Sequence, residues 1–263
     1  MTTWKLGDHT VRRIGFGAMR LDPATGVAVL RRAVELGVDH FDTAQFYGAA
    51  NELIREALSP YPPELLIATK VGPGTSPERG FYYATTAAEL RAQVEDNLRV
   101  LGVDSLGLVN LRVPDDSGSL GDHFAVLAAM RDEGLIQHLG VSNVRTEQLH
   151  EAMTIAPVVC VQNSYSVDQR TDDPLIDLCA SQGIAYVPFS SMVGGPTAAV
   201  QAAADAQGVS PQQIRLAWTL HRSPNILAIP GTGKIPHLEQ NVAAGGLQLT
   251  AQELAILGAR ERS

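Results

Sequence analysis

The 263-residue sequence contains only two cysteines, Cys160 and Cys179, and neither belongs to a C-x-x-C motif. Two thiols cannot form the disulfide framework that holds small secreted domains together. The seven histidines show no H-E-x-x-H or similar ligand spacing, so we expect no metal site. These shortages exclude disulfide-rich scaffolds and the common zinc motifs, and they fit a reducing compartment such as the cytoplasm.

Positive charge and long apolar runs are also scarce. The chain has 20 lysines and arginines against 28 acidic residues, which gives a formal net charge of −8. Nucleic-acid-binding domains usually have a basic surface. No apolar run approaches the roughly 18 residues of a membrane span, and the opening MTTWKLGDHT lacks the apolar core of a signal peptide. We therefore expect a cytoplasmic protein without a nucleic-acid or membrane partner.

Eight short apolar runs alternate with segments of helical periodicity. The runs are rich in Val, Ile and Leu, as is typical of strands buried on both faces. Strands that alternate with helices predict βαβ units and a parallel sheet. The runs span residues 14–19, 38–44, 65–71, 106–113, 136–143, 158–162, 184–190 and 226–231.

Eight such units in a chain of this length predict one (β/α)8 barrel domain over residues 1–263. The alternative is a doubly wound sheet, which would place a complete G-x-G-x-x-G turn after an early strand. Only Gly15-Phe16-Gly17 approximates that motif, and its third glycine is absent. Residues 4–13, with Gly7-Asp8 at a turn, predict a β-hairpin that covers the bottom of the barrel.

Polar residues end several of the expected strands, where barrels of this kind carry their chemistry. Asp42 ends the second strand and Lys70 the third, and Tyr47 follows in the loop after Asp42. An ammonium group favours the ionised form of a neighbouring phenol. A tyrosine in this setting can donate a proton to a carbonyl oxygen. The pattern therefore predicts acid–base chemistry on a carbonyl compound.

Several motifs give the chain a family resemblance. The segment Phe41-Asp42-Thr43-Ala44-Gln45-Phe46-Tyr47-Gly48 resembles the F-D-T-A-x-x-Y-G signature of the aldo-keto reductases. The resemblance extends from Gly15 to Asn241, and it implies a barrel that binds NADPH without a Rossmann domain and reduces aldehydes and ketones. The other matching motifs are Ala68-Thr69-Lys70, Gly140-Val141-Ser142-Asn143, Val161-Gln162-Asn163, Ile229-Pro230-Gly231-Thr232 and Glu239-Gln240-Asn241.

The resemblance also implies individual roles. Tyr47 would be the proton donor, with Asp42 and Lys70 tuning its acidity. The expected cofactor ligands are Ser142, Asn143 and Gln162 for the nicotinamide carboxamide, Phe189 for the nicotinamide ring, Ser190 and Gly194 in the loop 192–195 for the pyrophosphate, Thr232, Gly233, Lys234 and His237 for the 2′-phosphate, and Glu239, Gln240 and Asn241 for the adenine.

One position departs from the family pattern. The family usually has a histidine two residues before a Pro-Asp pair on the fourth strand, and this chain has Arg112 there. Arginine keeps a donor for the substrate carbonyl but cannot lose its proton. We expect Asn110, on the same face of the strand, to hold Arg112 in place. The V-N-L-R pattern resembles a bacterial subgroup of pyridoxal reductases, which implies a small-molecule carbonyl substrate with an ionised phenolate.

Some alternatives stay open at this level. Because Arg112 replaces the family histidine, a catalytically weak nicotinamide-binding sensor or partner module is the alternative to an enzyme. The loop 71–85, with Phe81, Tyr82 and Tyr83, either lines a substrate pocket or forms a rigid surface loop. Core packing is the alternative role of Phe189, and a surface charge is the alternative role of Lys234. Capping of the next helix is the alternative role of Ser142 and Asn143. The oligomeric state is undetermined, and the sequence is compatible with a monomer.

Lys234 is expected to favour NADPH over NADH. A lysine can pair with the 2′-phosphate of NADPH, which NADH lacks. Charge-assisted hydrogen bonds contribute roughly 1.5–3 kcal/mol, or about 10–150-fold in affinity. Lys234→Ala should therefore weaken NADPH binding by this order and leave NADH nearly unchanged in an equilibrium titration. An equal loss for both dinucleotides would mean that Lys234 acts through structure.

Overall fold

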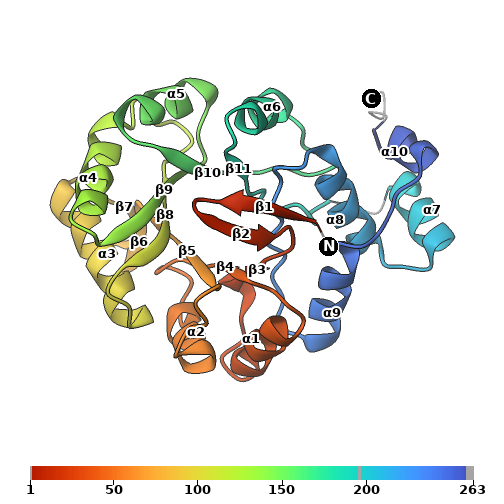
Figure 1. The fold of residues 1–263 in the computed structure, drawn as a ribbon, viewed down its shortest axis with the longest axis horizontal. Coiled ribbons are helices and arrows are strands. Elements are labelled where there is room, and N and C mark those ends of the chain that lie inside the picture. Colours follow the sequence, from red (N-terminus) through yellow and green to blue (C-terminus); the bar gives the residue numbers. More distant parts are fainter. Residues whose placement is uncertain (1, 195–196, 259–263) are drawn as a thin grey trace.

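Seven parallel strands form one curved sheet in the order β11-β10-β9-β8-β5-β4-β3. In the computed structural model, which describes residues 2–194 and 197–258, the segment 226–230 lies between the two edge strands. Ile14 forms a parallel bridge with Ala228, and Tyr186 forms one with Ile226. These bridges close the sheet, and helices surround it (Figure 1). The fold is the expected (β/α)8 barrel.

The elements follow one another along the chain as expected for βα units. The strands of the barrel are β3 (Phe16–Gly17), β4 (His40–Asp42), β5 (Leu66–Val71), β8 (Leu106–Arg112), β9 (Ile136–Ser142), β10 (Val158–Gln162) and β11 (Ala185–Tyr186). Two hairpins pair β1 (Thr3–Leu6) with β2 (His9–Arg12) and β6 (Pro73–Ser76) with β7 (Gly80–Tyr83). The helices are η1 (Ala18–Arg20), α1 (Gly26–Glu35), α2 (Ala50–Leu58), α3 (Ala87–Leu101), α4 (Gly121–Asp132), α5 (Thr146–Ile155), α6 (Asp173–Ser181), α7 (Ala198–Gln207), α8 (Pro211–Arg222), α9 (Ile235–Ala244) and α10 (Ala251–Gly258).

Four strands are shorter than the apolar runs predict, and one of them is the three-residue β4, which forms from the run 38–44. The run 14–19 forms only the two-residue β3 before the turn of η1, the run 184–190 forms only β11, and the run 226–231 forms bridges without a regular strand. Pro188 and Pro230 explain part of this difference, because proline has no N–H to donate to a ladder. The backbone of Gly17 nevertheless lies close to that of Ile229. A Cβ atom added to Gly17 would lie 2.6 Å from the carbonyl oxygen of Ile229.

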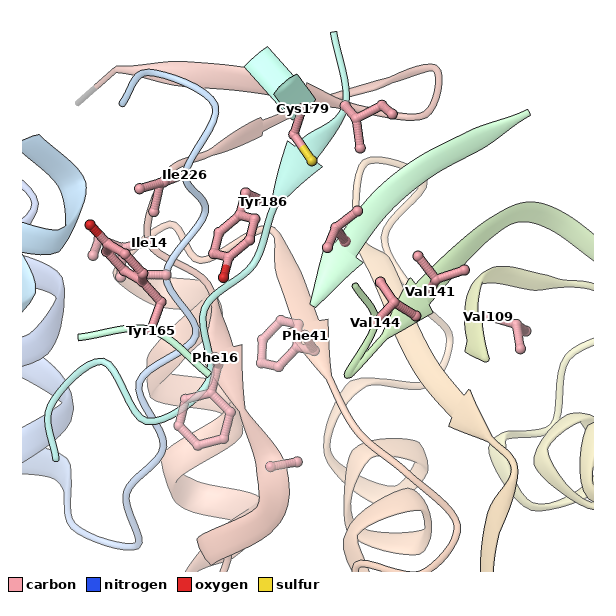
Figure 2. Packing of buried hydrophobic residues seen from close by; sticks show 14 of the residues in the cluster. Ile14, Phe16, Phe41, Val109, Val141, Val144, Tyr165, Cys179, Tyr186 and Ile226 are labelled. Atoms are coloured by element: carbon pink, nitrogen blue, oxygen red, sulfur yellow. The ribbon is translucent and has the colours of Figure 1, made fainter. Parts of the chain in front are cut away.

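Along the regular strands, side chains alternately point outward to the helices and inward to the centre of the barrel. Phe41, Val109 and Val141 belong to the cluster between the sheet and the helices, with Phe16 in the same layer (Figure 2). Their neighbours in sequence therefore point into the barrel. This alternation places Asp42, next to Phe41, inside the barrel mouth.

The N-terminal hairpin fills the other end of the barrel. Its Leu6 and Val11 are buried in an interior cluster with Leu66, Leu108 and Leu227. In Figure 1 this hairpin lies across the centre of the barrel. The prediction that residues 4–13 cover the bottom of the barrel is confirmed. Across the described ranges, no helix is both long and apolar enough to cross a membrane.

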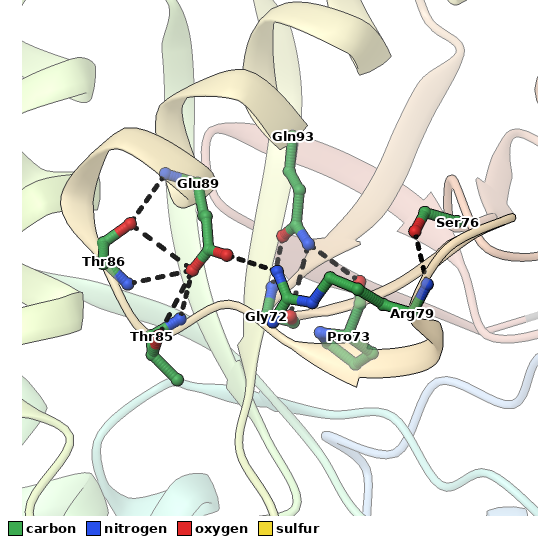
Figure 3. Close-up of polar contacts among 8 residues, drawn as sticks. All are labelled: Gly72, Pro73, Ser76, Arg79, Thr85, Thr86, Glu89 and Gln93. Atoms are coloured by element: carbon green, nitrogen blue, oxygen red, sulfur yellow. Dashed lines mark hydrogen bonds and ion pairs between the residues drawn. The ribbon is translucent and has the colours of Figure 1, made fainter.

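The second hairpin, β6–β7, is held against α3 at two points (Figure 3). At its base, the Gln93 side chain accepts from the Gly72 N–H at 2.8 Å and donates to the Pro73 carbonyl at 3.2 Å. Near its tip, the Arg79 guanidinium donates to Glu89 at 2.5 Å. Glu89 also accepts from the Thr85 N–H at 2.8 Å. The hairpin is therefore an ordered extension of the barrel rim.

Glu89 gives this anchor a pH dependence. The Thr85 N–H and the Arg79 guanidinium lower the pKa of Glu89 from 4.5 to about 2. A carboxylate with a depressed folded-state pKa stabilises the fold above its unfolded value, and this contribution is lost as pH falls through the folded value. We expect amide hydrogen exchange in residues 73–83, corrected for its intrinsic pH dependence, to accelerate between about pH 4.5 and 2. In Glu89→Gln the exchange should already be fast at pH 7 and lack this step, with β8 unchanged. A wild-type step that persists in the variant would contradict the assignment.

Candidate active site

A buried ion pair lies at the mouth of the barrel. The Lys70 Nζ donates to Asp42 Oδ1 at 2.6 Å and to the Thr43 carbonyl at 3.0 Å. The other carboxylate oxygen of Asp42 accepts from Gln162 Nε2 at 2.7 Å. Three strands, β4, β5 and β10, thus supply one hydrogen-bonded cluster, and Asp42 and Lys70 meet as the sequence predicts.

Tyr47 completes this cluster from the loop after β4. The Lys70 ammonium lies 4.9 Å from the centre of the Tyr47 ring. Burial alone would lower the pKa of Lys70, but the charge of Asp42 and the interactions with Tyr47 outweigh it and raise that pKa. Lys70 is therefore a cation at neutral pH. A fixed positive charge beside a phenol stabilises negative charge on the phenol oxygen, as a proton-donating tyrosine requires.

A polar network behind the cluster fixes the strand ends. The Thr43 hydroxyl donates to the Asn51 side chain at 2.7 Å, and Asn51 donates to Asn97 at 3.0 Å. The Thr69 hydroxyl also donates to Asn97, at 2.7 Å. Thr43 and Thr69 are the neighbours of Asp42 and Lys70, so helices α2 and α3 position both charges through hydrogen bonds. All four network residues are buried.

Arg112 reaches the same mouth from β8. Its guanidinium lies 4.9 Å from the centre of the Phe189 ring and donates to the Ser142 hydroxyl at 3.3 Å. The expected support from Asn110 is wrong, since no hydrogen bond joins the two side chains. Asn110 lies one layer deeper and is paired in register with Lys70. Stacking on Phe189 and the Ser142 hydroxyl therefore hold Arg112 in place.

These residues line one cavity of about 460 Å³. Asp42, Tyr47, Lys70, Arg112 and Gln162 form its polar part. One wall is aromatic: Phe46 packs edge-on against Tyr47 at 4.8 Å and contacts Phe81 at 6.1 Å, and Phe81 meets Tyr83 at 5.5 Å between ring centres. Phe81 and Tyr83 come from β7, so the loop 71–85 does line the cavity. Tyr82 lies on the other face of the hairpin, under the Arg79 guanidinium.

A second cavity of about 510 Å³ continues from the first. The two cavities share four residues, which come from the segments after β3, β11 and 226–230 and from α8, and together the cavities form a groove. The shared residues are Arg20, Met192, Gln212 and Gly231, and the second cavity is also lined by Asp22, Thr232, Gly233, Lys234, His237, Gln240 and Asn241.

The groove gathers most of the expected cofactor residues. Phe189 and Ser190 line the first cavity with Gln162. The buried Oε1 of Gln162 has no hydrogen-bond partner among the described residues. It is therefore free to accept from a ligand amide.

Some expected residues lie outside the groove lining. Ser142 and Asn143 line neither cavity, and the Asn143 amide donates to the Val113 carbonyl and to Asp115. Gly194 contacts the ion pair of Asp168 and Arg215, and a Cβ there would lie 2.0 Å from the Asp168 carboxylate. Glu239 pairs with Arg32 at 2.8 Å and also lies outside. Gly195 is outside the described residues.

The sequence reasoning missed three groups of groove residues. Arg20 and Asp22, from the segment after β3, face the positions expected to bind a cofactor. Gln212 joins from the first turn of α8, and Phe46 stands inside the recognised signature without a role. Phe46 could have been found from its place beside Tyr47. Arg20 and Gln212 have no local signal, because closure of the barrel brings them to the groove.

Comparisons with known proteins agree with this geometry. The chain matches the aldo/keto reductase family over residues 3–199 and 196–260. A pyridoxine 4-dehydrogenase of Escherichia coli K12 is 44% identical and covers 97% of this chain and 96% of its own. A thermostable aldo-keto reductase solved with the inhibitor epalrestat is 27% identical with a TM-score of 0.85, covering 98% and 99% of the two chains. An aldo/keto reductase of Klebsiella pneumoniae solved with NADP and acetate is 25% identical with a TM-score of 0.83, covering 99% and 97%.

The chain therefore belongs to the aldo/keto reductase family. The expectation of an NADPH-dependent oxidoreductase is confirmed at the level of this family. The sensor alternative, which rested on Arg112, receives no support from a site that keeps the Asp42, Lys70 and Tyr47 cluster.

Tyr47 provides the test of this site. Tyr47→Phe removes one hydroxyl and keeps the ring that packs against Phe46. Because general acid catalysis is typically worth about 10²–10⁴-fold, turnover of a carbonyl substrate should fall by this order while the dissociation constant for NADPH stays the same. Tyr82→Phe, on the outer face of the hairpin, is the matched control and should retain wild-type turnover. Near-wild-type turnover in Tyr47→Phe would exclude it as the proton donor.

Proposed function

We propose that this protein catalyses the NADPH-dependent reduction of a small aromatic aldehyde or ketone, of the pyridoxal type, to the alcohol. The observation that carries the proposal is the cluster of Asp42, Lys70 and Tyr47 at the end of a cavity with an aromatic wall. An ion pair at 2.6 Å beside a tyrosine matches what proton donation to a carbonyl oxygen needs.

The groove fits the proposed cofactor. The unpartnered Oε1 of Gln162 can accept from the nicotinamide carboxamide, and the Phe189 ring offers a face for the nicotinamide. Lys234 and His237, in the second cavity, can meet the 2′-phosphate, and Gln240 and Asn241 the adenine. Bound there, NADPH would supply a hydride from nicotinamide C4.

The chain's own residues perform the rest of the chemistry. Tyr47 donates its proton to the carbonyl oxygen as negative charge develops on it. Lys70 stabilises the charge left on the tyrosine, and Asp42 keeps Lys70 positioned and ionised. Arg112 donates a second hydrogen bond to the carbonyl oxygen, in the manner of an oxyanion hole. In the reverse direction the ionised Tyr47 would accept the proton from the alcohol, so the site also supports oxidation of the alcohol with NADP⁺ as the oxidant.

The substrate class follows from two features of the cavity. Phe46, Phe81 and Tyr83 present ring edges and faces, which suit a flat aromatic substrate. Arg112 adds a permanent positive charge, which suits an anionic group next to the carbonyl, such as the phenolate of pyridoxal. The Escherichia coli relative named as a pyridoxine 4-dehydrogenase supports the same class.

Arg112→His separates the charge of this side chain from its hydrogen bond. Histidine restores the usual family residue, so an uncharged aromatic aldehyde should be reduced at least as well as by the wild type. Pyridoxal should be reduced less well, because a neutral imidazole at pH 7.5 cannot pair with its phenolate. The measurement is kcat/KM for both substrates.

Arg112→Ala is the companion variant. Loss of one oxyanion donor typically costs about 10²–10³-fold in kcat, so both substrates should lose turnover at saturating NADPH. If Arg112→His changes both substrates by the same factor, Arg112 does not select for charge and the pyridoxal assignment loses its physical basis.

A further inference from the structure

Three strand ends and the segment after β11 lie side by side at the barrel mouth. In register, Arg112 at the end of β8 pairs with Ser142 at the end of β9, and Ser142 pairs with Gln162 at the end of β10. The segment after β11 comes next, because the Phe189 N–H donates to the Asn163 carbonyl at 2.9 Å. A side chain from β8 must therefore cross the ends of β9 and β10 to reach Phe189.

Arg112 makes this crossing. Its guanidinium lies over the Phe189 ring, 4.9 Å from the ring centre, and donates to the Ser142 hydroxyl at 3.3 Å. Ser142 is fully buried and lines neither cavity, whereas Arg112 and Phe189 both line the first cavity. The guanidinium therefore stands between this cavity and the Ser142 hydroxyl, on the ring of Phe189.

The groups at these strand ends suit the nicotinamide. Hydride transfer needs nicotinamide C4 within about 3–3.5 Å of a carbonyl carbon whose oxygen Tyr47 protonates, so the ring must lie at this end of the groove. Phe189 offers an aromatic face there. Ser142 offers a hydroxyl for a carboxamide, and Gln162 offers its buried Oε1, which has no partner among the described residues. Arg112 already uses the first two of these three groups.

We propose that Arg112 occupies the place of the nicotinamide before the dinucleotide binds, and that the nicotinamide displaces it toward the substrate carbonyl. This inference rests on the proposed function. A guanidinium is planar, stacks on aromatic faces and donates through N–H groups, and a ring with a carboxamide does the same, so one replaces the other on Phe189 and Ser142. Displacement frees the donors of Arg112 for a carbonyl oxygen held by Tyr47. Cofactor binding thus completes the pair of donors to that oxygen.

Displacement predicts that loss of Arg112 strengthens cofactor binding. A stacked guanidinium and one hydrogen bond must be broken before the nicotinamide can bind, and Arg112→Ala removes both. This variant should therefore bind NADPH about 5- to 30-fold more tightly than the wild type. 2′-Phospho-ADP-ribose has the phosphates of NADPH without the nicotinamide, so its affinity should stay the same. Calorimetric titration of the full chain measures both dissociation constants without turnover.

Two further variants control this titration. Arg112→Lys keeps the charge but loses the planar group, so its NADPH affinity should lie between those of the wild type and Arg112→Ala. Arg79→Ala removes a guanidinium stacked 3.9 Å from the centre of the Tyr82 ring, outside both cavities, and should change neither affinity.

A crystal structure of the wild type with NADP⁺ tests the displacement without any substitution. The Arg112 guanidinium should then lie more than about 6 Å from the centre of the Phe189 ring, beyond the range of a cation–π contact. The nicotinamide should lie on Phe189 in its place.

The outcomes separate the displacement of Arg112 from the proposed function. If the wild type binds neither NADPH nor 2′-phospho-ADP-ribose, the proposed cofactor is wrong. If the wild type binds both, and Arg112→Ala binds NADPH no more tightly than the wild type, the displacement alone is overturned. An equal gain for both ligands would also overturn it, because Arg112 would then act on the phosphates through its charge. A cofactor complex that keeps Arg112 on Phe189 would overturn it as well.

Discussion

The site depends on one buried ion pair, Asp42 with Lys70. Moving two charges out of water costs several kcal/mol for each, and attraction repays this only when the remaining donors and acceptors are bonded. Here Lys70 also donates to the Thr43 carbonyl, and Asp42 also accepts from Gln162. These bonds tie β4, β5 and β10 together, so a shift of any one strand would leave a buried charge without a partner. Because these bonds fix Lys70, its ammonium stays in place over the ring of Tyr47.

One side of the barrel has regular strand ladders and the other has only short pairings. The regular side positions the charged cluster, and the irregular side lines the groove. The long ladders of β5, β8, β9 and β10 hold the charged cluster in register. On the other side, β11, the segment 226–230 and β3 pair only briefly, and the chain after each of them lines the groove. The groove therefore lies mainly where the wall of the barrel has its fewest regular ladder bonds.

Alternation and periodicity made the barrel predictable, because a parallel strand inside helices must be apolar on its outer face. The same alternation brought Asp42, Lys70, Arg112 and Gln162 to one mouth, since each ends an apolar run. Alternation could not predict that Arg20 and Phe81 line the groove. Arg20 reaches the groove only when the barrel closes, and the direction of Phe81 depends on the register of β6 with β7, which side chains of α3 fix.

The wrong expectation for Asn110 shows how the departure at Arg112 is accommodated. Two residues along a strand point the same way, but they lie in different layers of a barrel. Asn110 lies beside Gly140, whose missing side chain leaves room for it, since a Cβ there would lie 2.0 Å from Asn110 Oδ1. Arg112, one layer higher, meets Phe189 and Ser142 instead. An arginine is therefore held at the family's histidine position by an aromatic face and a hydroxyl at the mouth. The neutral amide in the layer below adds no charge that would compete with Asp42 for Lys70.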